Sequence, residues 1–108
     1  MEYPVTEENG FMVVALSGDV DLSTSPDARK AILAALEHGK GVLVDLAGVA
    51  YLDSSGVASL VEAFQLARGK QQDFGLVGVS NSALSVLKLA RLDTVFPIHA
   101  SVAAASAS

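Results

Sequence analysis

The sequence predicts an α/β fold, in which a mixed β-sheet begins with a hairpin and continues with alternating helices and strands. Two observations carry this prediction. A hairpin signal stands near the start of the chain, and after it short apolar runs alternate with amphipathic segments of helical periodicity. Because single helices connect the later strands, the helices are expected to pack on the sheet.

The hairpin is predicted from residues 5–8 and 11–16, which are strand-like and are separated only by Asn9-Gly10. Asn-Gly readily supplies the two positive φ angles of a tight primed turn. The first two strands are therefore predicted to pair antiparallel.

The first helix is predicted to begin at Ser25-Pro26-Asp27, which combines a capping hydroxyl, a proline at the first helical position and an early acidic side chain. Apolar residues then recur at helical spacing from Ala28 to Leu36. We expect an amphipathic helix that ends at Gly39.

The central strand is predicted at residues 42–46, Val-Leu-Val-Asp-Leu, a nearly continuous apolar run that is typical of a strand covered on both faces. The second helix is predicted over residues 54–68, where apolar side chains again have helical spacing and Gly69 follows as a stop.

The last third of the chain predicts a strand over residues 74–79 and then a helix that Asn81 caps and that reaches Ala90. A final strand is predicted over residues 94–99. Pro97 interrupts it, which favours a sheet edge or an early strand end.

The composition predicts one folded domain over residues 1–108, with residues 1–4 and 100–108 weakly structured. Hydrophobic residues make up 51% of the chain and charged residues 18%, far from the composition of a disordered protein. The net charge of -5, with seven scattered Lys and Arg residues, argues against direct binding of nucleic acid.

Residue content also argues against several kinds of site. The chain has no cysteine and two isolated histidines without metal-ligand spacing, so neither a metal nor another cofactor is expected. No apolar run approaches the roughly 20 residues of a membrane span, and the first residues lack the order of a signal peptide. We expect a cytoplasmic protein without membrane insertion that is a monomer or a weak dimer.

Asp53-Ser54-Ser55-Gly56 stands where the central strand gives way to the second helix. The first N–H groups of a helix have no partner within it, so a phosphate on Ser54 would place about -1.5 to -2 charges at a favourable position. Asp53 adds a negative charge, and Gly56 permits the close approach of another backbone. The motif is equally a good helix start, because Ser and Asp are preferred capping residues.

Residues 45–57, Asp-Leu-Ala-Gly-Val-Ala-Tyr-Leu-Asp-Ser-Ser-Gly-Val, resemble the signature of the STAS domain family, in particular of its bacterial anti-sigma factor antagonists. In that signature an Asp-Leu strand end leads through a hydrophobic turn to Asp-Ser-Ser/Thr-Gly. Residues 16–24 are similar to the family's segment before the first helix, and residues 79–93 to its third-helix region. The resemblance covers roughly residues 10–99 and implies a STAS-like mixed sheet with helices packed on it.

The resemblance implies that Ser54 is phosphorylated, with Ser55 as the second choice. It also implies partner switching: the unphosphorylated antagonist binds an anti-sigma factor that is a serine kinase and so frees a sigma factor, and phosphorylation ends the binding. A PP2C-type phosphatase would restore it. The expected partner-binding residues are Asp19, Asp21, Thr24, Asp53, Ser54, Ser55 and Gly56.

Other interpretations stay open beside this one. A solvated turn with a helix cap is the alternative for Asp19, Asp21 and Thr24. The chain is not expected to be an enzyme, because it lacks a Gly-x-Ser-x-Gly elbow and neither histidine is predicted near the serines. The alternative within the family is a STAS subunit of an ABC-type lipid or solute transporter that docks on its ATPase. The intact Asp-Ser-Ser motif favours the antagonist.

Overall fold

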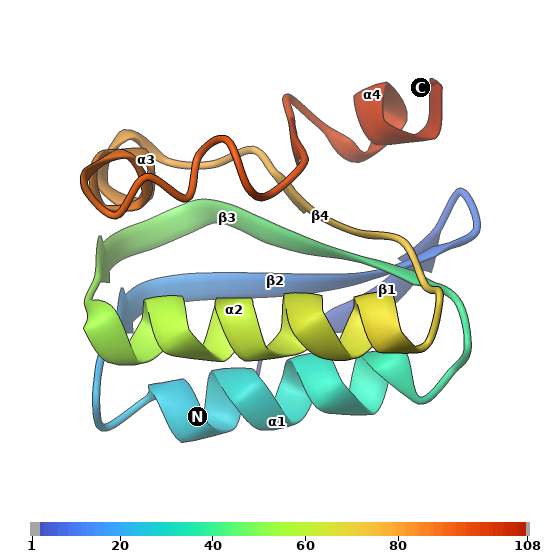
Figure 1. The fold of residues 1–108 in the computed structure, drawn as a ribbon, viewed down its shortest axis with the longest axis horizontal. Helices are drawn as coiled ribbons and strands as arrows, with labels where there is room; N and C mark the ends of the chain where they lie inside the picture. The colour runs from blue at the N-terminus through green and yellow to red at the C-terminus, as the bar shows by residue number, and fades with distance from the viewer. Residues whose placement is uncertain (1–2, 108) are drawn as a thin grey trace.

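The computed structural model describes residues 3–107, which form an α/β structure in the predicted order with one further helix at the end (Figure 1). The strands are β1 (Val5–Glu8), β2 (Phe11–Val20), β3 (Gly41–Leu52), β4 (Phe74–Val77) and β5 (Ile98–His99). The helices are α1 (Ser25–Leu36), α2 (Ser54–Gly69), α3 (Asn81–Leu89) and α4 (Val102–Ala107). The strands form one five-stranded sheet in the order β1-β2-β3-β4-β5. The predicted fold class is thus confirmed.

β1 and β2 form the predicted antiparallel hairpin. Their pairing ends with Glu8 opposite Phe11, which leaves Asn9 and Gly10 as a two-residue turn. Both turn residues have positive φ angles, 53° at Asn9 and 85° at Gly10, as a primed turn requires. The turn therefore sets the register of the first two strands.

The other strand pairs, β2 with β3, β3 with β4 and β4 with β5, are all parallel. β3 lies in the middle of the sheet, as its apolar sequence predicts, but it continues past Leu46 to Leu52. The interpretation of residues 47–52 as a turn is therefore wrong. Register shifts in the pairing with β2 let both strands deform there and still pair as far as Val20 with Leu52.

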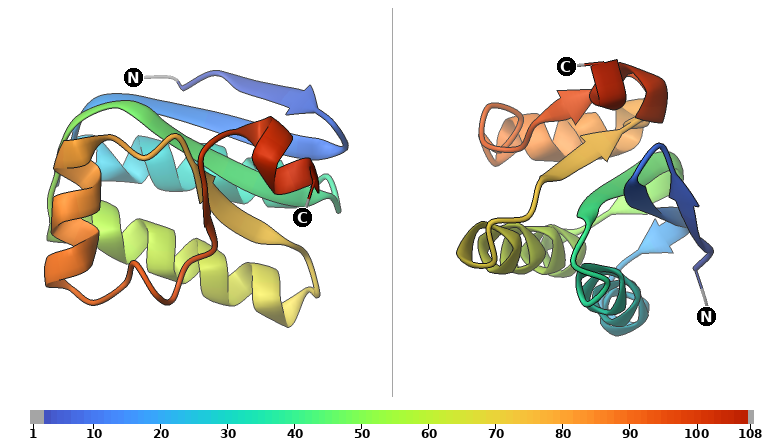
Figure 2. Two further views of the ribbon diagram at one scale, coloured as in Figure 1. Left: turned by 90° about the horizontal axis from the view of Figure 1, so that it is seen from above. Right: turned by 90° about the vertical axis from the view of Figure 1, so that its right-hand side faces the viewer.

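The helices lie on both faces of the sheet. α1 and α2 run side by side across one face (Figure 1). α4 lies on the opposite face against β4 and β5, and α3 packs against β3 (Figure 2). β5 is a two-residue strand at the sheet edge directly after Pro97, so the sheet edge predicted from the proline is confirmed. The prediction of a strand that starts at Thr94 is wrong, because residues 94–97 form no strand and β5 begins only after the proline.

The core follows the alternation of side chains along the strands. Val42, Val44 and Leu46 of β3 are buried in the larger apolar cluster, which includes Ile32 of α1 and Leu60 of α2. Because successive strand side chains point to opposite faces, Leu43 instead joins a smaller cluster beneath α4. The central strand is covered on both faces for this reason.

Both ends of the chain take part in the fold where the structure describes them. Tyr3 is buried in the larger cluster, and the Pro4 carbonyl accepts a hydrogen bond from the Ala15 N–H at 3.0 Å. Ala105 of α4 is buried in the smaller cluster. Met1, Glu2 and Ser108, which belong to the segments predicted to be weakly structured, lie outside the described residues.

Several helix ends differ from the prediction by one to three residues. α1 ends at Leu36 and not at Gly39. Thr24 precedes the first helical residue of α1, and Ser25 is the buried first residue, not the cap. Ser80, not Asn81, caps α3, because its hydroxyl accepts a hydrogen bond from the Ala83 N–H at 3.2 Å. Gly69 is the last residue of α2 and not its stop.

The stop of α2 lies two residues later, at Gln71, which has a positive φ of 57°. The N–H groups of Gln71 and Gln72 donate to the carbonyls of Arg68 and Ala67, at 3.1 and 2.9 Å. This is the hydrogen-bond pattern of a Schellman motif, which satisfies the last carbonyls of a helix without requiring glycine.

Among residues 3–107, no helix is long and apolar enough to cross a bilayer. The same residues contain no group of three or more His, Cys, Asp or Glu side chains placed to hold a metal ion.

Candidate functional site at the carboxyl ends of the central strands

The predicted site residues gather at one end of the sheet. β2 and β3 are parallel, so both end there, and α1 and α2 both begin there (Figure 1). The Asp53 N–H donates a hydrogen bond of 3.2 Å to the Val20 carbonyl and ties the two loops together. This edge is where parallel sheets commonly place their binding residues.

Asp53 is the N-cap of α2. Its backbone is extended, and its carboxylate accepts hydrogen bonds from the N–H groups of Ser55 at 2.9 Å and Gly56 at 3.2 Å. The suggestion that the serine hydroxyl caps the helix is therefore wrong, because the preceding carboxylate already satisfies those donors.

Ser54 is the first residue of α2 and is exposed. Within residues 3–107, its hydroxyl has no hydrogen-bond partner. Ser55 is half-buried, and its carbonyl accepts a hydrogen bond of 3.2 Å from the Ser59 hydroxyl. Of the two serines in the motif, Ser54 is thus the more accessible to another protein.

Gly56 is buried in the first turn of α2. A Cβ atom at this position would lie 2.5 Å from Leu52 Cδ1, 2.9 Å from Val20 Cγ1 and 3.0 Å from the Val20 carbonyl oxygen. The backbone that approaches Gly56 closely is the end of this chain's own β2. The glycine lets α2 begin directly against the sheet, and this contact sets where Ser54 stands.

The loop between β2 and α1 is closed by Asp21 and Thr24. One carboxylate oxygen of Asp21 accepts from the Ser23 N–H at 3.0 Å, the Ser23 hydroxyl at 2.7 Å and the Thr24 N–H at 3.2 Å. The Thr24 hydroxyl accepts from the Asp21 N–H at 2.9 Å and donates to the Asp19 carbonyl at 2.7 Å. These contacts are those expected of a turn before a helix, which was the alternative interpretation of Asp21 and Thr24. The Asp19 side chain is exposed.

The same contacts set the ionisation of Asp21. The hydrogen bond from the Ser23 hydroxyl, followed by those from the backbone N–H groups of Ser23 and Thr24, outweighs desolvation and lowers the pKa of Asp21 below its ordinary value. Asp21 is therefore negatively charged at neutral pH.

Two exposed apolar side chains at this end were not singled out by the sequence analysis. Leu22, in the loop after β2, is 77% exposed, and Tyr51, near the end of β3, is 52% exposed. The sequence signal that could have identified Tyr51 is the alternation of side chains along a strand. Leu52 is buried, so its neighbour Tyr51 points to the other face of the sheet. The extent of β3 had to be known before that signal could be used.

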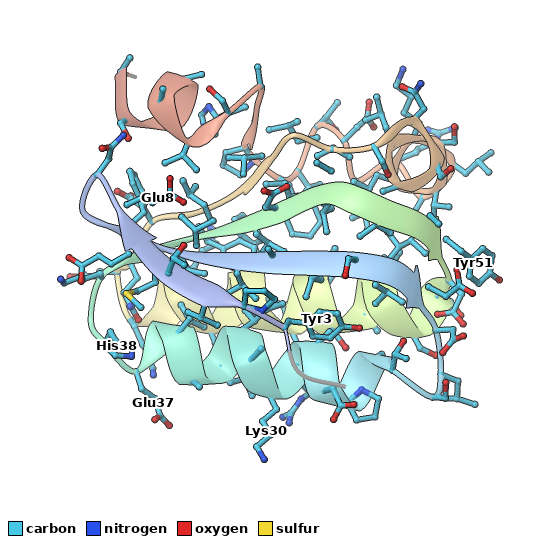
Figure 3. All side chains as sticks on the ribbon, turned by 180° about the vertical axis from the view of Figure 1, so that it is seen from behind. Tyr3, Glu8, Lys30, Glu37, His38 and Tyr51 are labelled. Atoms are coloured by element: carbon cyan, nitrogen blue, oxygen red, sulfur yellow. The ribbon has the colours of Figure 1, made fainter. Side chains whose placement is uncertain are left out.

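The two histidines lie away from the serines of the Asp-Ser-Ser-Gly motif. His38 follows the far end of α1, and Figure 3 shows it at the opposite end of the molecule from Tyr51. His99 is in β5, beside Gly75. Grooves of about 360 and 490 Å³ are lined by other parts of the chain, at Phe11 and His99 and at Tyr3 and His38 respectively. Among residues 3–107, no hydrogen bond joins either histidine to Ser54 or Ser55.

The capping assignment predicts a stability difference between neighbouring residues. Replacing Asp53 with alanine is expected to lower the free energy of unfolding by about 1 kcal/mol, because two N–H groups lose their acceptor. Asp53→Asn retains an acceptor and is expected to cost less. Ser54→Ala is the control, expected within about 0.5 kcal/mol of the wild-type protein because its hydroxyl makes no such bond. Urea unfolding measures all three, and an equal loss for Ser54→Ala would contradict the assignment.

Comparison with known proteins shows the family of the chain. The family model for "Mlab, STAS domain" matches residues 5–98. A curated relative, the anti-sigma-B factor antagonist of Listeria monocytogenes, is 27% identical over 86 residues, which cover 79% of this chain and 75% of the relative.

Solved structures are similar over nearly the whole chain. An anti-sigma factor antagonist from Mycobacterium paratuberculosis is 28% identical, with a TM-score of 0.82 over 93% of this chain and 86% of that chain. An anti-sigma-factor antagonist (STAS) domain protein from Planctomyces limnophilus is 24% identical, with a TM-score of 0.85 over 99% of this chain and 97% of that chain. The family match runs from the start of β1 to the first residue of β5, and it includes α1, α2 and α3 together with the Asp-Ser-Ser-Gly helix start. The chain belongs to the STAS domain family.

Proposed function

We propose that this protein is an anti-sigma factor antagonist that works by partner switching, with Ser54 as the phosphorylated residue. The observation that carries the proposal is the exposed Ser54 hydroxyl, which stands free at the start of α2 while Asp53 performs the capping. A kinase can therefore modify Ser54 without removing a hydrogen bond that holds the fold. The anti-sigma-B factor antagonist among the relatives supports the same function.

Phosphorylation at this position changes the surface and leaves the fold in place. The phosphate would add about -1.5 to -2 charges at the positive end of the α2 dipole, which favours it locally. Asp53 is next to it and adds a second negative charge. The modified surface is then strongly anionic, although the sheet and helices are unchanged.

The partner in this proposal is an anti-sigma factor that is itself a serine kinase. To transfer a phosphoryl group, such a partner must bring nucleotide phosphates up to the Ser54 hydroxyl. Once Ser54 carries phosphate, its charge faces the phosphates of the nucleotide that the kinase still holds, and this repulsion dissociates the complex. A PP2C-type phosphatase then restores the binding-competent form, and the sigma factor is freed only while the antagonist is unphosphorylated.

Substitutions at Ser54 test the charge switch. With the anti-sigma factor kinases of the source bacterium purified one by one, Ser54→Asp is expected to weaken binding of the cognate kinase about tenfold or more, which is about 1.4 kcal/mol. Ser54→Ala is expected to bind like the wild-type protein but to resist phosphorylation. Calorimetric titration measures the affinities, and peptide mass spectrometry locates the phosphate.

Ser82→Asp is the matched control, because Ser82 is also an exposed serine in the first turn of a helix, α3. It should bind the kinase as the wild-type protein does. Equal binding by Ser54→Ala and Ser54→Asp would contradict the switch, and phosphate found away from both Ser54 and Ser55 would overturn the site. Binding to a transporter ATPase, with none to any kinase, would favour the transporter subunit instead.

A further inference from the structure

Two large apolar side chains are exposed near the Ser54 motif, one in the loop after β2 and the other near the end of β3. Leu22 is 77% exposed and Tyr51 is 52% exposed, although most of the chain's large apolar residues are buried. Figure 3 shows Tyr51 projecting outward at the end of the molecule where β3 terminates. Exposed apolar groups that gather at one place commonly mark a contact with another protein.

The chain holds Leu22 in its exposed position. Asp21 and Thr24 close the loop on either side of it through hydrogen bonds of 2.7 to 3.2 Å. Because these bonds lie within the loop, Leu22 is presented at the tip of an ordered turn. A side chain that is already ordered loses less entropy when it binds, so more of its burial contributes to affinity.

Tyr51 is held by the sheet itself. It lies opposite Asp19 in the parallel pairing of β2 with β3, and the next pair along, Val20 with Leu52, is buried. Since alternate residues of a strand point to opposite faces, Tyr51 and Asp19 share the face that turns away from the packed side of α2. Tyr51 and Leu22 are therefore presented by adjoining strand ends.

The same end of the molecule carries acidic side chains. Asp19, Asp21 and Asp53 lie within this end of the molecule, and none of them is paired with a cation among residues 3–107, where the ion pairs shown join Arg29 with Glu62 and Lys40 with Glu7. Two apolar side chains with unpaired carboxylates near them are complementary to an apolar pocket that has positively charged side chains at its edge.

We propose that Leu22 and Tyr51 are the apolar anchors of the partner-binding surface, and that the bound protein offers them an apolar pocket edged by Lys and Arg side chains. The inference rests on the proposed function, because the protein that docks there is the anti-sigma factor kinase. Leu22 and Tyr51 supply most of the affinity, and the three carboxylates guide association and fix its orientation. Docking through these anchors brings Ser54 to the kinase's nucleotide.

The test uses the full chain and the purified kinase that binds the wild-type protein. Leu22→Ala and Tyr51→Ala are each expected to weaken binding about tenfold or more, as removal of a central anchor does. Leu89→Ala is the control, because Leu89 is 87% exposed at the end of α3, a helix that contributes none of the residues of the proposed surface. It should bind like the wild-type protein. Urea unfolding of all three variants should show little change, since each side chain is exposed.

A second readout tests the carboxylates. Rising salt should weaken the complex, and Asp19→Asn should reduce both the association rate and its dependence on salt. If Leu22→Ala and Tyr51→Ala both bind normally while Ser54→Asp still weakens binding, the anchor proposal is overturned and the proposed function stands. If no anti-sigma factor kinase of the source bacterium binds the wild-type protein, both are overturned. An equal loss for Leu89→Ala would place the contact elsewhere and refute the anchors.

Discussion

Replacing Gly56 with alanine is expected to destabilise the protein by about 2 kcal/mol or more, because the added methyl group has no space. It would lie 2.5 Å from Leu52 Cδ1, which can move, and 3.0 Å from the Val20 carbonyl oxygen, which belongs to the backbone of β2. Relief requires α2 to shift away from the strand ends. The same shift displaces Ser54, so kinase binding is expected to weaken along with stability.

Gly69→Ala is the matched control in the same helix. A Cβ atom at Gly69 meets nothing within 4 Å, and Gly69 lies within α2 without a positive φ angle. Alanine is therefore expected to stabilise the protein by about 0.5 to 1 kcal/mol, because it is the better helix former. Urea denaturation measures both variants. Equal stabilities of Gly56→Ala and Gly69→Ala would show that α2 does not press against the strand ends.

Replacing Leu87 with alanine is expected to cost about 3 kcal/mol, because it leaves a cavity under α3. Leu87 is fully buried and belongs to the larger apolar cluster, which also includes Phe74 and Phe96. α3 is a helix of nine residues, and two of them, Ala83 and Leu87, are buried. With so few buried side chains, the helix depends strongly on this leucine for its attachment to the sheet.

Leu89→Ala removes the same atoms two residues away, where the side chain is 87% exposed. Its free energy of unfolding is expected to stay within about 0.5 kcal/mol of the wild-type value. Thermal and urea unfolding give the comparison. A loss at Leu89 as large as that at Leu87 would mean that α3 packs with another face toward the sheet.

These predictions share one physical feature, which is that the site depends on rigid contacts beneath it. The Ser54 hydroxyl has no hydrogen-bond partner among residues 3–107, so its position follows from Asp53 and Gly56. A surface serine placed in this way can gain or lose a phosphate without a change in the core. The chain thereby separates the residues that maintain the fold from the residue that would carry the signal.

The fold could be predicted from local patterns because each pattern has a local cause. Asn9-Gly10 favours one type of turn, and that turn dictates an antiparallel pair. The β-branched run at residues 42–46 and the helical spacing after Ser54 indicate buried elements through periodicity alone. The serine motif was also evident in the sequence, since it occupies consecutive positions at one helix start.

What the sequence by itself determined is therefore the order of the elements, the central place of β3 and the position of the Asp-Ser-Ser-Gly motif. Only the tertiary structure decided that β3 continues to Leu52, that Asp53 rather than Ser54 caps α2, and that Tyr51 is left in water. The physical reason is that these outcomes depend on contacts between residues far apart in the chain. The close approach of Gly56 to Val20 joins the start of α2 to the end of β2, more than thirty positions apart in the chain, and no local pattern specifies that contact.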